Sequence, residues 1–462
     1  MTRICLLIPF VAGLLWVGCG PGGEDPGPVR SRLEGRLSVA AEVDSTGDYG
    51  GFEVLVVDNS TGDVDTLGRA VTDSTGAFGL DVRAPFRGIF PLLINRAGAQ
   101  LYFGELVVAH GDTARIQATF PLRRPSLVVR GSRENGAWMA YRSAKDHHTR
   151  VLSEVLREQG YEAGRVANTI RQTSNLMWGL QQTYPGTLGA TVAAAEAVVM
   201  LDGWDDALLV ERARQLPPDH PNLVEVMRAA RRAQARLRGQ EAALALLREF
   251  QARTPSNETW AGLQSEVVLA YIDSLQQDEA LAAAQELARR APDGRWVRWS
   301  DRAVYELENL MPGMPAPGFV VTTLDGRTVR LDSLRGRVVV LEFYAPRNEI
   351  FLREVGLRNR LYRALDAFPV TVVAVSLDPD TLITEAFLEG RDIPGLHVVA
   401  PGGLDGPLAG LYNVNLLPTR YLIGPDGTIV SKYVGSAMVP LQIELAGLLG
   451  LRPRTDAPVS AR

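Results

Sequence analysis

Hydrophobic and polar residues follow three successive patterns along the chain. From about residue 31 to 130, they alternate in short runs such as Leu37–Val43 and Phe52–Val57, separated by Gly, Asp and Ser. A period of two is typical of half-buried strands, so this region predicts a small antiparallel β-sandwich. From about 134 to 310, Ala, Leu, Arg, Glu and Gln recur at helical spacing, which predicts an all-α region. From 314 to 450, nearly continuous apolar runs alternate with helical segments, which predicts an α/β domain.

Three similar turns interrupt the predicted sandwich. They begin at Asp44, Asn59 and Asp73, each followed by Ser-Thr-Gly. Asx residues favour the start of such turns, and glycine accepts a positive φ near their end. A calcium loop is the alternative, but none of the three has the alternating carboxylates and final Glu that such a loop needs. The segments Thr72–Phe78 and Arg87–Phe90 resemble carboxypeptidase-regulatory-like sandwiches, and this resemblance implies packing or partner contact instead of chemistry.

The helical region contains three similar stretches, which begin at Asp206, Glu241 and Glu279 and each run to a proline. Their starts lie 35 and 38 residues apart, close to the ~34-residue helix-turn-helix unit of a tetratricopeptide repeat. The region is therefore either a tetratricopeptide-like array or a plain helical bundle, and in both cases a spacer or a partner-binding surface. Adjacent His147 and His148 would point about 100° apart on a helix, so a metal site shared by them is not expected.

The C-terminal region shows the clearest order of elements. Val338–Tyr344 and Val370–Ser376 are nearly continuous apolar runs, as expected of buried central strands, and residues 352–368 between them have helical spacing. Two further strands, Thr419–Ile423 and Ile429–Tyr433, flank a Gly-Pro-Asp-Gly turn typical of a hairpin. A βαβ unit followed by an antiparallel hairpin and a closing helix predicts a thioredoxin-like arrangement.

Four motifs of this domain resemble those of TlpA/ResA-type envelope thiol-disulfide oxidoreductases and their redoxin (AhpC/TSA-related) relatives. They are Gly313–Phe319, Leu324–Gly326, Leu331–Ala345 and Leu417–Thr419. The resemblance implies a thioredoxin-like fold and places Pro418 at the cis-proline position beside the family's active site. Cis peptide bonds are rare outside X-Pro sequences, so this position is a structural commitment of the fold.

The same resemblance implies that the redox residues have been replaced. Asn348 stands at the position of the attacking cysteine and Phe351 at that of the resolving cysteine, while Glu354 matches the acidic residue that follows. Disulfide exchange requires a thiolate, which neither an amide nor a phenyl ring supplies. Asn is a favoured N-cap residue, so we expect Asn348 to cap the helix after the first central strand. The functional alternative is that the groove beside Pro418 docks extended peptides.

Other candidate sites are weak. Asp378-Pro379-Asp380 follows the second central strand, at the sheet edge where α/β domains bind ligands, but acidic residues also cap loops there for structural reasons. A Ser/His/Asp set, a P-loop and a G-x-G-x-x-G motif are all absent from the sequence. We therefore expect no cofactor and no metal.

Composition narrows the classes of function. The chain has 462 residues, a formal net charge of −5 and two cysteines, Cys5 and Cys19. This length suits about three domains. The charge gives no basic surface for nucleic acid. The position of the cysteines excludes a disulfide scaffold, a Cys-ligated zinc site and a C-x-x-C pair in the folded body.

The N-terminal segment predicts the compartment. An apolar run over residues 4–17 is too short for a mature membrane span and is typical of a signal peptide. Residues 15–19 resemble a bacterial lipobox, in which Cys19 becomes the lipidated first residue; plain secretory cleavage nearby is the alternative. Residues 20–30 predict a flexible Gly/Pro tether, and residues 451–462 a tail. We expect a lipid-anchored protein of the bacterial cell envelope that faces the periplasm or the exterior.

Two classes of function follow from these observations. The preferred one is a non-catalytic envelope protein, in which a redox-inactive thioredoxin-like domain on a helical spacer and a sandwich binds envelope proteins or extended peptides. The alternative is a redoxin-family oxidoreductase in cell redox homeostasis, with thiols supplied by a partner. A small-ligand site in the groove near Pro418 is a third hypothesis, for which the sequence names no ligand.

Overall fold

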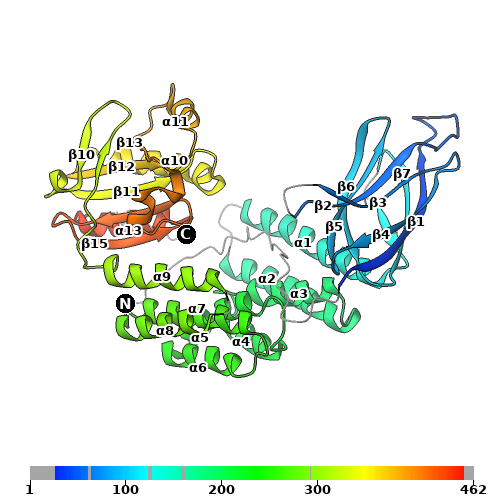
Figure 1. Ribbon diagram of the computed structural model, residues 1–462, viewed down its shortest axis with the longest axis horizontal. Helices are drawn as coiled ribbons and strands as arrows, with labels where there is room; N and C mark the ends of the chain where they lie inside the picture. The colour runs from blue at the N-terminus through cyan, green and yellow to red at the C-terminus, as the bar shows by residue number, and fades with distance from the viewer. Residues whose placement is uncertain (1–26, 61–63, 123–126, 158–161, 292, 452–462) are drawn as a thin grey trace, which may run out of the picture. The chain divides into compact units, whose positions relative to one another are not determined.

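The computed structural model describes residues 27–60, 64–122, 127–157, 162–291 and 293–451. The predicted signal peptide, Cys19, most of the predicted tether and nearly all of the tail lie outside these residues. The chain forms two compact units (Figure 1): residues 1–275 with 290–292, and residues 276–289 with 293–462. The division falls inside the region 134–310 that the sequence pattern treats as one helical spacer.

The first unit begins with two four-stranded sheets. Their strands are β1 (Val29–Val39), β2 (Phe52–Asp58), β3 (Asp65–Val71), β4 (Ala77–Ala84), β5 (Gly88–Arg96), β6 (Ala99–Val108), β7 (Thr113–Phe120) and β8 (Val128–Arg130). The sheet orders are β4-β1-β7-β8 and β3-β2-β5-β6. Side chains from both sheets, among them Leu33, Phe52, Phe90 and Ile116, form one core. Alternate residues of β4 and β7 are buried, because successive side chains of a strand point to opposite sides.

Helices complete the first unit. They are α1 (Arg133–Arg157), α2 (Ala163–Thr183), α3 (Leu188–Val199), α4 (Asp206–Gln215), α5 (Leu223–Arg238), α6 (Gln240–Gln251) and α7 (Asn257–Asp273). In the second unit, α8 (Gln277–Arg290) and α9 (Gly294–Asn309) follow. The starts of α4, α6 and α8 lie at or within two residues of the three predicted repeat starts. A tetratricopeptide-like array stays a prediction.

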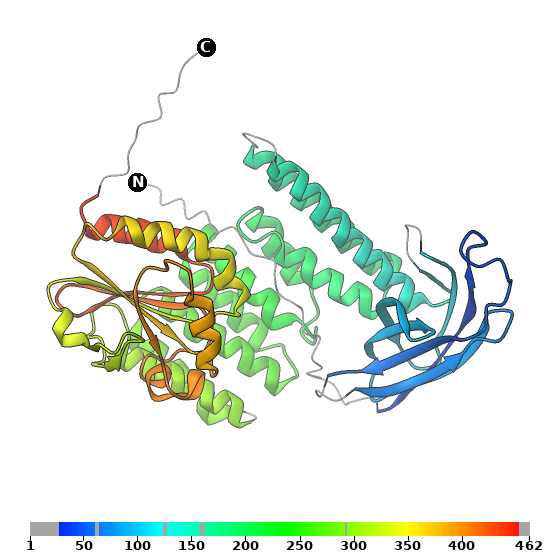
Figure 2. The same ribbon diagram turned by 90° about the horizontal axis from the view of Figure 1, so that it is seen from above.

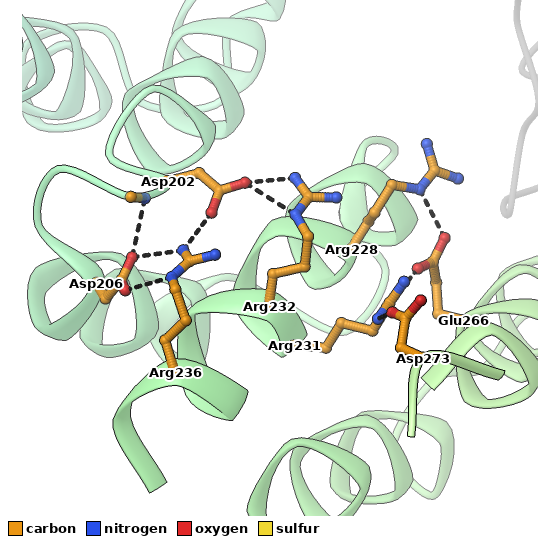
Figure 3. A network of polar contacts seen from close by, with 9 residues as sticks. Asp202, Asp206, Arg228, Arg231, Arg232, Arg236, Glu266 and Asp273 are labelled. Carbon is orange, nitrogen blue, oxygen red and sulfur yellow. Dashed lines mark hydrogen bonds and ion pairs between the residues drawn. The ribbon is translucent and has the colours of Figure 1, made fainter. Parts of the chain in front are cut away.

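Helix α5 carries arginines that bind carboxylates on neighbouring segments (Figure 3). The pairs are Arg232–Asp202, Arg236–Asp202, Arg236–Asp206, Arg228–Glu266, Arg231–Glu266 and Arg231–Asp273. Glu266 is fully buried and lies 2.6 Å from Arg228 and 2.8 Å from Arg231. Burying a carboxylate without such partners is unfavourable, so the network fixes α5 against α4 and α7.

The second unit continues as an α/β domain. Its elements after α9 are β9 (Val320–Thr322), β10 (Thr328–Arg330), β11 (Val338–Tyr344), α10 (Glu349–Ala364), β12 (Val370–Ser376), α11 (Thr381–Leu388), β13 (Leu396–Val399), α12 (Pro407–Leu411), β14 (Thr419–Ile423), β15 (Ile429–Val434) and α13 (Met438–Leu448). The main sheet has the order β13-β12-β11-β14-β15. Strand β11 runs parallel to β12 and antiparallel to β14. The predicted βαβ unit, hairpin and closing helix are present, and every residue of β11 is buried, as its continuous apolar run requires.

Helices cover both faces of this sheet. On one face, α10 and α13 lie side by side (Figure 2). Beneath them, Val340 and Leu422 of the sheet share a core with Leu441 of α13. On the other face, Leu310 after the end of α9 joins a core that contains Phe343 and Tyr412. The hydroxyl of Tyr305 on α9 donates a hydrogen bond to the carbonyl of Leu411 at 3.0 Å. Helix α9 is therefore part of the C-terminal domain, which explains why the chain divides within the helical region.

Candidate functional site

The junction between β11 and α10 contains Asn348 and Phe351, the two positions that the family resemblance aligns with cysteines. Asn348 is the N-cap of α10: its side-chain Oδ1 accepts a hydrogen bond from the backbone N–H of Phe351 at 3.0 Å. The predicted capping role of Asn348 is confirmed. The helix begins earlier than residue 352, the start that the apolar pattern predicts, because the cap precedes the first apolar residues.

Phe351 lies inside the domain instead of at its surface. Its ring is 1% exposed and stacks on Tyr344 with the ring centroids 4.5 Å apart. The ring of Phe387 on α11 lies 5.8 Å away, so the three aromatic rings form one small core between β11, α10 and α11. A side chain this deeply buried packs the fold and does not meet a substrate.

A buried ion network lies under α10. Glu342 of β11 accepts hydrogen bonds from Arg358 Nε at 2.6 Å and Arg420 Nε at 2.8 Å, and all three side chains are fully buried. Arg420 also lies 3.1 Å from Glu354, whose other oxygen accepts a hydrogen bond from Ser436 at 2.7 Å. Two carboxylates thus balance two guanidinium groups inside the domain.

The electrostatics of this network hold Glu342 in its charged form. Burial alone would raise the pKa of Glu342, but the attraction of Arg358 and Arg420 and their hydrogen bonds outweigh it, and the pKa lies below its ordinary value. Burial would lower the pKa of Arg420, yet Glu342 raises it overall. Glu342 therefore cannot exchange a proton near neutral pH, and the network has a structural role.

Sequence reasoning missed this network. Its one sequence signal is Glu342, a charged residue in the middle of a strand predicted to be buried on both faces. Such a residue requires a buried partner. The partners could not be named, because Arg358 and Arg420 lie 16 and 78 residues away along the chain.

The segment before β14 forms the other side of the candidate site. The Leu417–Pro418 peptide bond is cis. Leu416 is 62% exposed, whereas Pro418 is buried. Within the described part of the chain, the backbone N–H and C=O of Leu417 form no hydrogen bond. The segment therefore presents an apolar side chain next to unpaired backbone groups.

The acidic residues after β12 serve the local fold. Asp378 is buried and binds the guanidinium of Arg347 at 3.1 and 3.2 Å. Asp380 caps α11, since its side chain accepts a hydrogen bond from the N–H of Leu382 at 3.0 Å. Both aspartates therefore stabilise the loop and the start of α11, as the structural alternative for these residues predicts.

The remaining polar candidates also have local partners. His147 and His148 bind different groups, Arg150 and Thr173 respectively, each at 2.9 Å. In the predicted turns, Asp73 accepts hydrogen bonds from the N–H groups of Thr75 and Ala77. The turn after Asn59 lies partly outside the described residues.

The described parts of the chain contain neither a metal-binding cluster nor a membrane-spanning helix. Over these residues, no three His, Cys, Asp or Glu side chains are grouped so as to hold a metal ion. Among the described helices, none combines the length and apolar character needed to cross a membrane.

Comparison with known proteins places this domain in a family. A profile of the AhpC/TSA family matches residues 312–432. The "Thiol-disulfide oxidoreductase ResA" of Bacillus cereus (strain ZK / E33L) is 30% identical over 128 residues, which are 28% of this chain and 72% of that protein. The chain belongs to the AhpC/TSA family.

Further proteins resemble the same region. The ResA protein of Oceanobacillus iheyensis is 32% identical over 121 residues, 25% of this chain and 62% of that protein. Among solved structures, a putative thiol:disulfide interchange protein DsbE from Chlorobium tepidum is 28% identical and covers 31% of this chain and 100% of its own, with a TM-score of 0.28. The family match concerns the C-terminal domain and leaves the two four-stranded sheets and most of the helices of the first unit outside it.

Proposed function

We propose that this AhpC/TSA-family chain is a non-catalytic envelope protein whose C-terminal domain binds extended segments of other proteins. The observation that carries the proposal is the β11–α10 junction, where Asn348 caps the helix and Phe351 fills the core. Every cysteine of the chain lies at residue 19 or before. Thiol-disulfide exchange proceeds through a thiolate, so the folded domain lacks the group that its relatives' names require.

The proposed binding surface is the segment Leu416–Pro418. The exposed Leu416 side chain offers apolar contact, and the unpaired backbone of Leu417 offers one donor and one acceptor. An extended peptide carries the complementary backbone groups, so main-chain hydrogen bonds give affinity, and contact with Leu416 gives preference for an apolar side chain. This surface needs no thiol.

The proposed location rests on the N-terminal sequence. The apolar run and the lipobox-like residues 15–19 support export and lipidation of Cys19. The Gly/Pro-rich tether, the paired sheets and the helices would then hold the C-terminal domain away from the membrane. The helices, as a tetratricopeptide-like array or a bundle, would act as the spacer.

We expect the full chain to bind a fluorescent insulin B chain whose cysteines are carboxymethylated. Leu416→Asp weakens this binding by about tenfold, because a buried leucine side chain is worth about that factor in affinity. Fluorescence anisotropy measures the binding. Val320→Asp, the same change at an exposed residue of β9, is the matched control and leaves the affinity unchanged. Equal binding by the Leu416 variant, or no binding by the original chain, contradicts the proposed surface.

We expect the purified chain not to accelerate the reduction of insulin by dithiothreitol, because no thiolate lies in the folded domain. Turbidity of the precipitating B chain measures the rate, and a ResA relative serves as the positive control. Turnover by the chain alone would contradict the proposal. Turnover that appears only when a separate dithiol protein is added would instead support the alternative function, in which a partner supplies the thiols.

A further inference from the structure

Helix α13 is apolar on both of its sides. Met438, Leu441 and Leu445 are buried in the core beneath the helix. On the opposite side, Val439 is 56% and Ile443 69% exposed. A helix on the surface of a soluble domain normally carries polar side chains on its outer face, and one that is apolar all round is normally buried. The outer face of α13 therefore has the composition of an interface.

The polar residues of α13 do not protect this face. Glu444 accepts hydrogen bonds from the hydroxyl groups of Ser431, at 2.8 Å, and Tyr433, so its carboxylate is directed at β15. Gln442 is the one exposed polar side chain between Met438 and Leu448. The charge of the helix is thus used within the domain, and its outer face is uncharged.

Three residues at four-residue spacing form a row on this face, which we call the α13 stripe: Val439, Ile443 and Gly447. Residues four apart on a helix make the ridges that most often interdigitate in helix packing. Gly447 is exposed, and a Cβ atom added there would meet no atom within 4 Å. The stripe therefore has a large residue at one end, a large residue at its centre and an open position at the other end.

We propose that the α13 stripe binds the α13 stripe of a second copy of this chain, with the two helices antiparallel. A two-fold axis at Ile443 then places Val439 of each copy over the partner's Gly447, and the two Ile443 side chains meet at the axis. In a two-fold interface the same patch serves both copies, so it must be complementary to itself. The α13 stripe satisfies this condition, because the large end of each copy lies over the small end of the other. The stripe also carries no charge that would repel the same charge in the second copy.

The chain beyond α13 does not suit this face. Residues 452–462 read Arg-Pro-Arg-Thr-Asp-Ala-Pro-Val-Ser-Ala-Arg, with two prolines, four charges and Val459 as their one large aliphatic side chain. Such a composition supplies no second row of large apolar side chains. A second copy of α13 supplies such a row.

The contact area sets the strength of this association. A standard stable interface uses about 800 Å² from each partner, and the stripe with its neighbour Leu448 provides much less. The dimer is therefore weak and forms at micromolar or higher protein concentration. Helix α13 of each monomer stays folded on its own core when the copies separate.

Sedimentation equilibrium of the full chain, over a range of concentrations, tests the proposal. We expect a monomer–dimer equilibrium whose dissociation constant rises at least about tenfold in Ile443→Lys, because the change removes apolar contact and places two like charges at the axis. Each substituted side chain is exposed, so the circular dichroism spectrum stays unchanged. A chain that is monomeric at every concentration, or a dimer unaffected by Ile443→Lys, overturns the proposal.

A double variant tests the antiparallel register. Val439→Glu alone and Gly447→Lys alone each weaken the dimer, whereas the two changes in the same chain restore it to within about threefold, since opposite charges then face each other across the interface. Within one helix the two positions lie about 12 Å apart and do not contact each other. Failure of the double variant to recover overturns the register and with it the proposed pairing of Val439 with the partner's Gly447.

Discussion

Glu342→Gln will destabilise the C-terminal domain by about 3–5 kcal/mol, the usual result of removing one partner from a buried ion pair. The amide keeps the shape of the side chain but leaves Arg358 and Arg420 fully buried without their shared counter-charge. Glu354 contacts Arg420 and cannot compensate both guanidinium groups. Hydrogen exchange of peptides from β11 and β14 in the full chain measures the lost stability, because their backbone amides then exchange faster.

The contribution of Glu342 to the stability of the domain decreases as the pH falls. The pKa of Glu342 is lowered in the folded domain, so its contribution to stability is complete above the ordinary glutamate pKa and is lost as the pH falls through the lowered value. The difference in the free energy of unfolding between the original chain and the Gln variant therefore becomes smaller in acid. Asp325→Asn, which breaks an exposed pair with Arg327, is the control and leaves exchange unchanged. Unchanged protection in the Glu342 variant would show that the network is not structural.

Phe351→Ala will destabilise the same domain by about 3–5 kcal/mol, the range for truncating a fully buried aromatic side chain. The substitution opens a cavity between Tyr344 and Phe387 and removes a stacked ring pair. Denaturant unfolding, monitored by hydrogen exchange of α10 peptides, measures the free energy of unfolding. Asn348→Ala is the comparison variant and costs about 1 kcal/mol, because it removes only the helix cap.

The contrast between these two variants tests how the junction is built. If Phe351 is core and Asn348 is a cap, the first substitution costs several times more than the second, and both leave peptide binding at Leu416 intact at temperatures where the domain is folded. A cost below about 1 kcal/mol for Phe351→Ala would mean that the position is not part of the core. The interpretation of Phe351 as a packing residue would then be wrong.

Features that depend on nearby residues were predictable. The capping role of Asn348 involves a backbone group three residues away, so a local preference is enough to identify it. The burial of β11 follows from its own apolar run, and the hairpin of β14 and β15 from its turn residues. The family motifs added the position of Pro418, whose preceding peptide bond is cis.

Features that depend on distant residues were not predictable. The partners of Glu342 come from α10 and β14, and only the order of strands in the sheet brings them together. The same holds for α9, whose pattern is helical but whose place in the C-terminal domain depends on contacts such as Tyr305 with Leu411. A helical pattern does not state which domain the helix covers.

The sequence by itself determined that the chain has strand-rich, helical and α/β regions, that its last domain resembles the redoxins, and that no cysteine lies beyond residue 19. Tertiary structure alone decided that Phe351 is core, that Glu342 and Glu354 balance Arg358 and Arg420, and that one apolar side of α13 faces solvent. The reason is the range of the interactions. Periodicity, caps and turns act over a few residues, whereas burial and charge pairing depend on which segments the fold makes neighbours.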